Sequence, residues 1–269
     1  MTATRIVVHG ALGRMGRAVI AALHAAGGDL QLVAALDREG ADALGRDAGE
    51  QAGAGTLGVK ITSSIDVALA AAEVVIDFSS PGATAAIARA CAARRVPLVV
   101  GTTGLDAQAD TALAAVASVA PTVVAANFSI GVAVLAHLAA RAATLLGDFD
   151  AEIVEMHHRG KRDAPSGTAL RLARAVADAR GVDLAARAVH GRSGTPGPRP
   201  EGEIGILALR GGDVVGDHTL ILAGPGERLE LTHRATSRDL FARGALRAAA
   251  WTVGRAPGRY DMSDVLGLG

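Results

Sequence analysis

Residues 6–16 read Ile-Val-Val-His-Gly-Ala-Leu-Gly-Arg-Met-Gly, and this stretch decides the fold class. Ile6 to Val8 form a β-branched run typical of a strand, and the glycines at 10, 13 and 16 indicate a tight turn. Arg17 to Ala26 is predicted as a helix that ends at Gly27 and Gly28. Strand, glycine turn and helix in this order bring backbone N–H groups and a helix N-terminus to a dinucleotide pyrophosphate.

The spacing of these glycines is a weak signal on its own. Leu12 stands where the commoner G-x-G-x-x-G pattern has its second glycine, so an ordinary tight turn stays an alternative. Asp37 follows Gly16 by 21 residues, at the end of a predicted strand over Gln31–Leu36, where a carboxylate can bind a ribose hydroxyl. Arg38 beside it can meet a 2′-phosphate instead, so the choice between NADH and NADPH stays open.

The pattern of apolar strand followed by helix then repeats. Such continuous apolar strands predict a parallel sheet that is buried on both faces. The further predicted elements are strands at Glu73–Phe78, Pro97–Val100 and Thr122–Ala126, and helices at Pro81–Arg94 and Asp106–Val119. Gly101-Thr102-Thr103-Gly104 and Ala125–Phe128 lie at the carboxyl ends of two of these strands, where open sheets bind ligands, although plain turns are the alternative.

In the second half of the chain, the regular alternation of strand and helix stops. Helices are predicted at Ile130–Leu146, Ser166–Arg180 and Asp239–Val253, and strands at Ala151–Met156, Glu203–Leu209, Val214–Ala223 and Arg228–Ala235. Several strands in succession indicate a second, α+β domain with a mixed, largely antiparallel sheet. The expected fold class is therefore α/β, with an N-terminal Rossmann-type parallel sheet and this second domain.

Glu155 to Thr168 carries the strongest chemical signal. His157, His158, Arg159, Lys161 and Arg162 place five basic or imidazole side chains within six positions, which predicts an anion site. Adjacent strand residues point to opposite faces, so the two histidines need different roles. Ser166 is a plausible helix N-cap, and the amides of Gly167 and Thr168 suit a carboxylate. The alternative is a solvated basic loop that binds no ligand. The spacing of the histidines does not favour a zinc site.

Composition narrows the function classes. The chain of 269 residues has 27 basic and 27 acidic side chains, so no global positive field favours nucleic acid or an anionic membrane. The single cysteine, Cys91, and the absence of a signal-peptide pattern favour a cytoplasmic protein without internal disulfides. Only Lys60 and Lys161 are lysines, and a lysine, unlike an arginine, can give up its proton.

Several motifs together resemble one family along the whole chain: VVHGALGRMG, DREGADALGRDAGEQAG, GTTG, AANFSIGV, EMHHRGKRDAPSGTAL, LRGGDVVGDHTL, GERLELTHRATSR and YDMSDVL. These residues resemble 4-hydroxy-tetrahydrodipicolinate reductase, and EMHHRGKRDAPSGTAL is the most specific among them. The resemblance implies reduction, by NADH or NADPH, of a cyclic dicarboxylate in diaminopimelate and lysine biosynthesis. It also implies a homotetramer built on the second domain's sheet. Another dehydrogenase of a dicarboxylic amino acid and a nucleotide-sensing module remain the alternatives.

The resemblance also implies roles for individual residues. His157 and Lys161 are expected to be catalytic, as proton donors, and His158, Gly167 and Thr168 to bind substrate carboxylates. No metal is expected. The dinucleotide domain is expected over 1–128, completed by 238–269, and the substrate-binding and oligomerisation domain over 129–237. The expected cofactor contacts are Gly10, Ala11, Leu12, Gly13, Arg14, Met15, Asp37, Arg38, Gly101, Thr102, Thr103, Ala125, Ala126, Asn127 and Phe128.

Overall fold

The computed structural model describes residues 3–268 and divides them into two compact units. Within that range, unit 1 comprises the residues up to 130 and those from 239 onward, and unit 2 comprises residues 131–238. The C-terminal segment therefore returns to the unit that the N-terminal half forms. The described part of the chain holds no helix that is both long enough and apolar enough to cross a membrane.

Unit 1 is built on a seven-stranded sheet in which all pairings are parallel, as predicted. The strand order is β12-β6-β5-β4-β1-β2-β3. Because chain order reverses between the neighbouring strands β1 and β4, their carboxyl ends form the place where such sheets bind ligands. The strands are β1 (Thr4–His9), β2 (Leu30–Leu36), β3 (Ile61–Thr62), β4 (Val74–Asp77), β5 (Leu98–Val100), β6 (Pro121–Val124) and β12 (Gly258–Tyr260).

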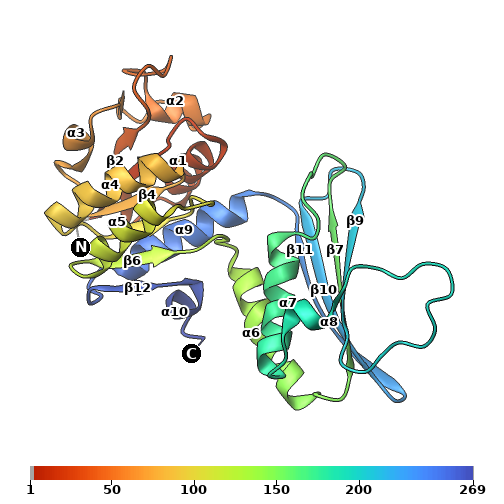
Figure 1. Cartoon of the computed structure of the whole chain (residues 1–269). Coiled ribbons are helices and arrows are strands. Elements are labelled where there is room, and N and C mark those ends of the chain that lie inside the picture. Colours follow the sequence, from red (N-terminus) through yellow and green to blue (C-terminus); the bar gives the residue numbers. More distant parts are fainter. Residues whose placement is uncertain (1–2, 269) are drawn as a thin grey trace. The chain divides into compact units, whose positions relative to one another are not determined.

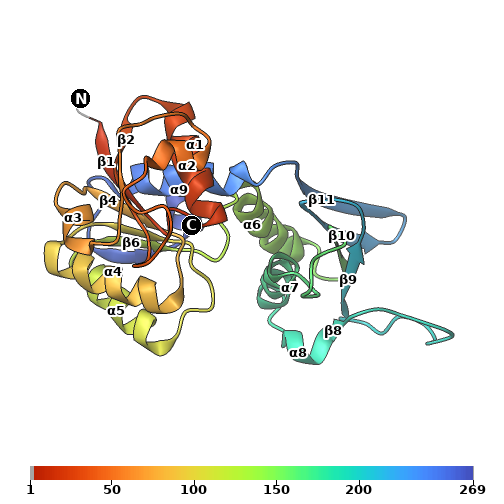
Figure 2. The same ribbon diagram turned by 90° about the horizontal axis from the view of Figure 1, so that it is seen from above.

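Helices cover both faces of this sheet, which is why its central strands are apolar without alternation. In Figures 1 and 2, α1 and α9 lie on one face, and α3, α4 and α5 on the other. Ile6, Val7 and Val8 of β1 are fully buried as a result. The helices are α1 (Arg14–Ala26), α2 (Ala48–Ala52), α3 (Ile65–Leu69), α4 (Pro81–Arg94), α5 (Ala107–Ala117), α9 (Asp239–Thr252) and α10 (Met262–Leu266).

Unit 2 is a five-stranded sheet whose one face carries two long helices (Figure 1). The strand order is β11-β10-β7-β9-β8. Its core lies between the sheet and the helices, where Leu135, Ile153, Leu172 and Leu220 are buried. The elements are α6 (Ile130–Leu145), β7 (Asp150–His157), α7 (Gly167–Ala179), α8 (Leu184–Arg187), β8 (Ala188–Val189), β9 (Ile204–Arg210), β10 (Gly216–Gly224) and β11 (Glu227–Ala235).

The second sheet is mixed, as predicted, and combines antiparallel with parallel pairings. β10 pairs antiparallel with β7 and β11, whereas β9 pairs parallel with β7 and β8. The reason is the connection: α7 follows β7 and crosses the face of the sheet before the chain enters β9, and a helical crossover returns the chain in the same direction. Successive strand patterns alone did not reveal this crossover.

Two further differences concern element boundaries. Helix α1 begins at Arg14 and not at Arg17, because Gly13 adopts an extended backbone (φ −68°, ψ 162°) as N-cap and its carbonyl accepts the first helical bond, from Arg17 N. The elements α2, α3, α8, α10, β3, β8 and β12 were not predicted. Each has only two to five residues, which is too short to show a hydrophobic period.

Candidate active site

The turn between β1 and α1 leaves no room for side chains at its glycines. Gly10 has φ +75°, and a Cβ there would lie 2.5 Å from the carbonyl oxygen of Phe78. A Cβ on Gly16 would collide with the Gly10 carbonyl. No side chain caps the N-terminus of α1. The turn therefore exposes backbone in a shape that fits a phosphate next to a helix N-terminus.

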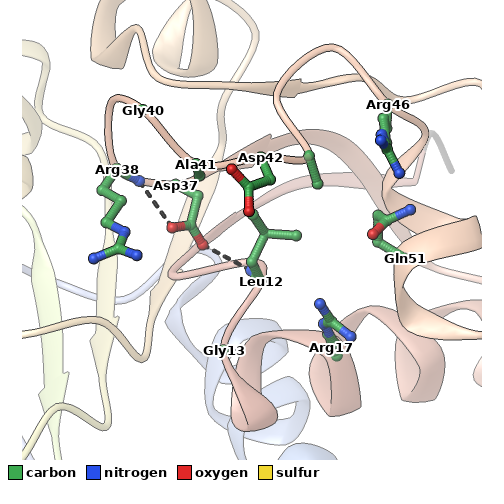
Figure 3. A pocket seen from close by; sticks show the side chains of 11 residues that line it. Leu12, Gly13, Arg17, Asp37, Arg38, Gly40, Ala41, Asp42, Arg46 and Gln51 are labelled. Carbon is green, nitrogen blue, oxygen red and sulfur yellow. Dashed lines mark hydrogen bonds between the residues drawn. The ribbon is translucent and has the colours of Figure 1, made fainter.

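Asp37 is fixed beside this turn. Its Oδ2 accepts a hydrogen bond from Leu12 N at 2.7 Å, and its Oδ1 accepts one from Arg38 N at 2.8 Å. Figure 3 shows the carboxylate at the wall of a pocket of about 480 Å³. The Arg17 and Arg46 side chains line the same pocket. The pocket therefore combines the carboxylates of Asp37 and Asp42, which can accept from a hydroxyl, with the guanidinium groups of Arg17, Arg38 and Arg46, which can bind an anion.

A buried carboxylate, Asp77, connects the loops at this edge of the sheet. Its carboxylate accepts hydrogen bonds from the hydroxyls of Ser79, Thr84 and Thr102, and Nδ1 of His9 lies 2.9 Å away. Burial alone would raise the pKa of Asp77, but the imidazole and the hydroxyls around it outweigh burial and lower the pKa. Asp77 thus ties together the residues next to the glycine turn, the β4–α4 loop and the Gly101–Thr103 loop.

The other predicted cofactor residues lie at the same edge but differ in what they expose. Ala11 and Phe128 are buried (1 % exposed each), so neither presents side-chain surface to a ligand. Gly101 packs against the Phe78 ring, which a Cβ would overlap. Asn127 Oδ1 accepts a hydrogen bond from Ser129 N at 2.8 Å.

In unit 2, the helix-covered face of the sheet changes from apolar to polar along β7. Ile153 lies between Leu220 and Ile206 of the neighbouring strands, whereas Glu155 lies opposite His218, and His157 lies opposite Arg210. Because Glu155 and His157 are two residues apart on a strand, they share this face. The apolar core therefore ends in a cluster of ionisable side chains at the carboxyl end of β7.

Glu155 is the centre of that cluster. It is fully buried, and its two oxygens accept hydrogen bonds from both Arg210 Nη atoms (2.8 and 2.9 Å) and from Ser166 N (3.0 Å). Nδ1 of His157 lies 2.6 Å from Oε2. Burial would raise the pKa of Glu155, but Arg210, His157 and the Ser166 amide together lower it.

His218 completes the cluster as a neutral ring. Its Nε2 lies 2.9 Å from the Ser166 hydroxyl, and its ring meets His157 edge to face at 5.1 Å between centroids. Burial, together with the positive charges of His157 and Lys161, lowers the pKa of His218 to about 4. Ser166 caps α7 by accepting a hydrogen bond from Ala169 N, as predicted.

The residues after β7 form a loop with two separate groups of charges. His158 leaves the strand direction: its N–H donates to the carbonyl of Val214, and its Nε2 lies 3.5 Å from an Nη of Arg238. Lys161 Nζ donates to both carboxylate oxygens of Asp163 at 2.8 Å. His157 and His158 thus have different surroundings, as their adjacency on a strand end predicted.

Gly167 and Thr168 lie in the first turn of α7, directly after the Ser166 cap. A Cβ on Gly167 would meet nothing within 4 Å, so space adjoins the helix N-terminus there.

Sequence reasoning missed Glu155, Asp163, Arg210, His218 and Arg238 in this unit, and Arg17, Arg46 and Asp77 in the other. Only Glu155 had a local signal, its spacing of two from His157.

Both halves of the chain match models of one family. Residues 4–128 match "Dihydrodipicolinate reductase, N-terminus", and residues 131–266 match "Dihydrodipicolinate reductase, C-terminus". Two curated relatives bear the name 4-hydroxy-tetrahydrodipicolinate reductase. The protein of Alkalilimnicola ehrlichii is 53 % identical over 98 % of this chain and 99 % of its own, and that of Thiobacillus denitrificans is 54 % identical over 98 % of both.

Solved structures have the same fold. The "Dipicolinate bound Dihydrodipicolinate reductase from Paenisporosarcina sp. TG-14" superposes with a TM-score of 0.76, at 24 % identity, over 97 % of this chain and 98 % of its own. A myo-inositol dehydrogenase from Corynebacterium glutamicum superposes with a TM-score of 0.60, at 17 % identity, over 99 % of this chain and 93 % of its own.

A parallel sheet with a glycine turn, joined to an α+β unit with a basic cluster, defines the class of two-unit oxidoreductases with a Rossmann-type domain. Within that class, the family is clear from the matches along nearly the whole length. The chain belongs to the dihydrodipicolinate reductase family, whose curated members are called 4-hydroxy-tetrahydrodipicolinate reductase.

Proposed function

We propose that this protein reduces 4-hydroxy-tetrahydrodipicolinate to tetrahydrodipicolinate, with NADH or NADPH, in diaminopimelate and lysine biosynthesis. The observation that carries the proposal is the identity of about half of all residues with named reductases over 98 % of the chain. A non-catalytic nucleotide sensor would need the glycine turn but not the buried Glu155–His157 pair beside a cluster of cations.

The residues of unit 1 fit a nicotinamide dinucleotide. The turn at Gly10, Gly13 and Gly16 would hold the pyrophosphate, and Asp37 or Arg38 the adenosine ribose or its 2′-phosphate. The bound nicotinamide supplies a hydride. Asp37 favours the free hydroxyl of NADH, whereas Arg38, with Arg17 and Arg46 in the same pocket, favours the phosphate of NADPH, so we propose that both cofactors are used.

The residues of unit 2 suit a cyclic dicarboxylate. His158, Gly167 and Thr168 would bind its carboxylates, with the N-terminus of α7 and the nearby Arg238 adding positive potential. The conversion needs loss of the 4-hydroxyl group as water as well as uptake of a hydride and a proton. Addition of the hydride to the conjugated imine that forms when water leaves places negative charge on the ring. His157 and Lys161 would stabilise that charge and deliver the proton that quenches it.

We also propose a homotetramer formed through the sheet of unit 2. The face that the helices leave uncovered carries an apolar row, in which Val154 lies opposite Leu207 and Met156 lies opposite Leu209. Leu209 is 50 % exposed in the single chain. Apolar side chains on an open sheet face favour burial against another copy. Analytical ultracentrifugation should give four times the chain mass, and a monomer at micromolar concentration would refute this proposal.

The activity is tested by adding the freshly formed cyclic substrate to the purified protein with NADH or NADPH and following loss of nicotinamide absorbance. Substrate-dependent oxidation of at least one cofactor is expected. Binding of a cofactor without turnover of this substrate would favour the nucleotide sensor. Turnover of a different dicarboxylic amino acid only would favour another dehydrogenase.

A further inference from the structure

We infer that Glu155 is a positioning residue: it keeps a proton on Nδ1 of His157 and thereby presents Nε2 of that ring to the substrate. The inference rests on the proposed function in one respect only, that His157 is the proton donor. The arrangement itself comes from contacts within unit 2.

The environment of Glu155 keeps its carboxylate ionised. Both oxygens are occupied: Oε1 accepts from Arg210 and Ser166 N, and Oε2 accepts from Arg210 and faces Nδ1 of His157 at 2.6 Å. An ionised carboxylate can only accept hydrogen bonds. A proton in the short contact with His157 must therefore lie on Nδ1.

Nε2 of His157 is therefore the ring nitrogen that is left for proton transfer. With Nδ1 protonated toward Glu155, Nε2 is the atom at which His157 gains or releases a proton. A Cβ at Gly216 would lie 2.9 Å from Nε2, so the glycine leaves that nitrogen clear of a side chain at position 216. The His157 side chain is 12 % exposed, which leaves an edge of the ring accessible.

The surroundings of the pair keep the ring in place without competing for its proton. Arg210 lies opposite His157 on β9 and holds Glu155 with two parallel hydrogen bonds, a geometry that fixes the carboxylate plane. His218 lies opposite Glu155 on β10, packs edge to face on His157, and is neutral. Among the contacts of the described residues, Glu155 is the acceptor that faces Nδ1 of His157, and Arg210, on the neighbouring strand, carries only donors.

The test replaces Glu155 by glutamine, which keeps the shape but has one acceptor oxygen in place of two. Arg210 and the Ser166 amide compete for that oxygen, so the amide NH₂ faces Nδ1 and opposes a proton there. We expect E155Q to lower kcat by about 10²- to 10⁴-fold, the range for losing a general acid, with KM near wild type. E155D keeps a carboxylate at this position, so its kcat should lie between that of E155Q and that of the wild type.

The matched control is E152Q. Glu152 lies on the same strand and also pairs with arginines, Arg192 and Arg199, but it does not contact His157. E152Q should keep wild-type kcat. If E155Q also keeps wild-type kcat, or if E152Q loses as much, the inference is wrong.

Nitrogen-15 NMR of His157 tests the inference without turnover and so separates it from the proposed function. In the wild type, the neutral ring should carry its proton on Nδ1, with Nε2 unprotonated, and in E155Q this tautomer should be lost. A neutral wild-type ring protonated on Nε2 would overturn the inference even if E155Q fails to fold. Absence of reductase activity with the expected tautomer would instead count against the proposed function alone.

Discussion

Nζ of Lys161 lies 2.8 Å from both carboxylate oxygens of Asp163, two residues further along the loop. The lysine side chain is 18 % exposed and the aspartate 66 % exposed. This contact with Lys161 is the main cause that lowers the pKa of Asp163. The ammonium that we propose as a proton donor is therefore held by a carboxylate on the solvent side, and a substrate carboxylate would compete for the same group.

Lys161→Arg separates proton donation from charge. Arginine keeps the ion pair with Asp163 but holds its proton at any working pH. If Lys161 donates a proton, kcat should fall by about 10²- to 10⁴-fold in steady-state assays. Stability should change little, because exposed ion pairs contribute only about 0–1 kcal/mol.

Lys60→Arg is the control for this variant, since Lys60 is the other lysine of the chain and is exposed in unit 1. It should behave as wild type. A Lys161→Arg enzyme that keeps most of its kcat and changes only KM would show that the lysine supplies charge and that His157 alone carries the proton.

Thr168→Val tests the proposed carboxylate site at the N-terminus of α7. The substitution keeps the shape but removes a hydroxyl, so KM should rise by an amount equivalent to about 1–3 kcal/mol, roughly 5- to 150-fold, with kcat little changed. Thr144→Val, an exposed threonine on α6 in the same unit, is the matched control. An unchanged KM in Thr168→Val would place the substrate elsewhere.

Arg38→Ala tests cofactor selection. Loss of a hydrogen bond to a charged phosphate costs about 1.5–3 kcal/mol, so the Kd for NADPH should rise roughly tenfold or more while the Kd for NADH changes little. Titration calorimetry with both cofactors measures this difference. Arg89→Ala removes an equal charge from the exposed face of α4 and should affect neither. Equal losses for the two cofactors in Arg38→Ala would refute the assignment.

Asp77→Asn tests whether the buried carboxylate stabilises unit 1. Its pKa in the folded state is lowered below 3.8, so its contribution to stability is present above about pH 4 and is lost as the pH falls through the folded pKa. Near pH 7 the variant should be less stable by about 1–3 kcal/mol, the cost of an impaired buried polar group. The difference from wild type should shrink as the pH falls below 4.

Urea unfolding at several pH values measures this dependence. Asp29→Asn, at an exposed position in the same unit, should leave the free energy of unfolding near wild type. A stability difference between Asp77→Asn and wild type that does not change between pH 7 and pH 3 would mean that the charge of Asp77 has no role.

Local sequence determined the longer elements and the motifs of this protein. The parallel sheet was predicted because strands buried on both faces are continuously apolar, and the helix Pro81–Arg94 was predicted with its observed bounds because proline starts it. The glycine turn, the Ser166 cap and the basic cluster after β7 are all contiguous in the chain. Each depends on neighbours within a few residues, which a single sequence displays.

Only the tertiary structure decided which distant residues meet. Arg210 reaches Glu155 across 55 positions, and His218 reaches Ser166 across 52, because β9 and β10 pair with β7 in one register. The period of a strand shows that Glu155 and His157 share a face, but the register with neighbouring strands depends on the packing of the whole sheet. Asp77 likewise gains His9 and Thr102 only because three parallel strands end at one edge.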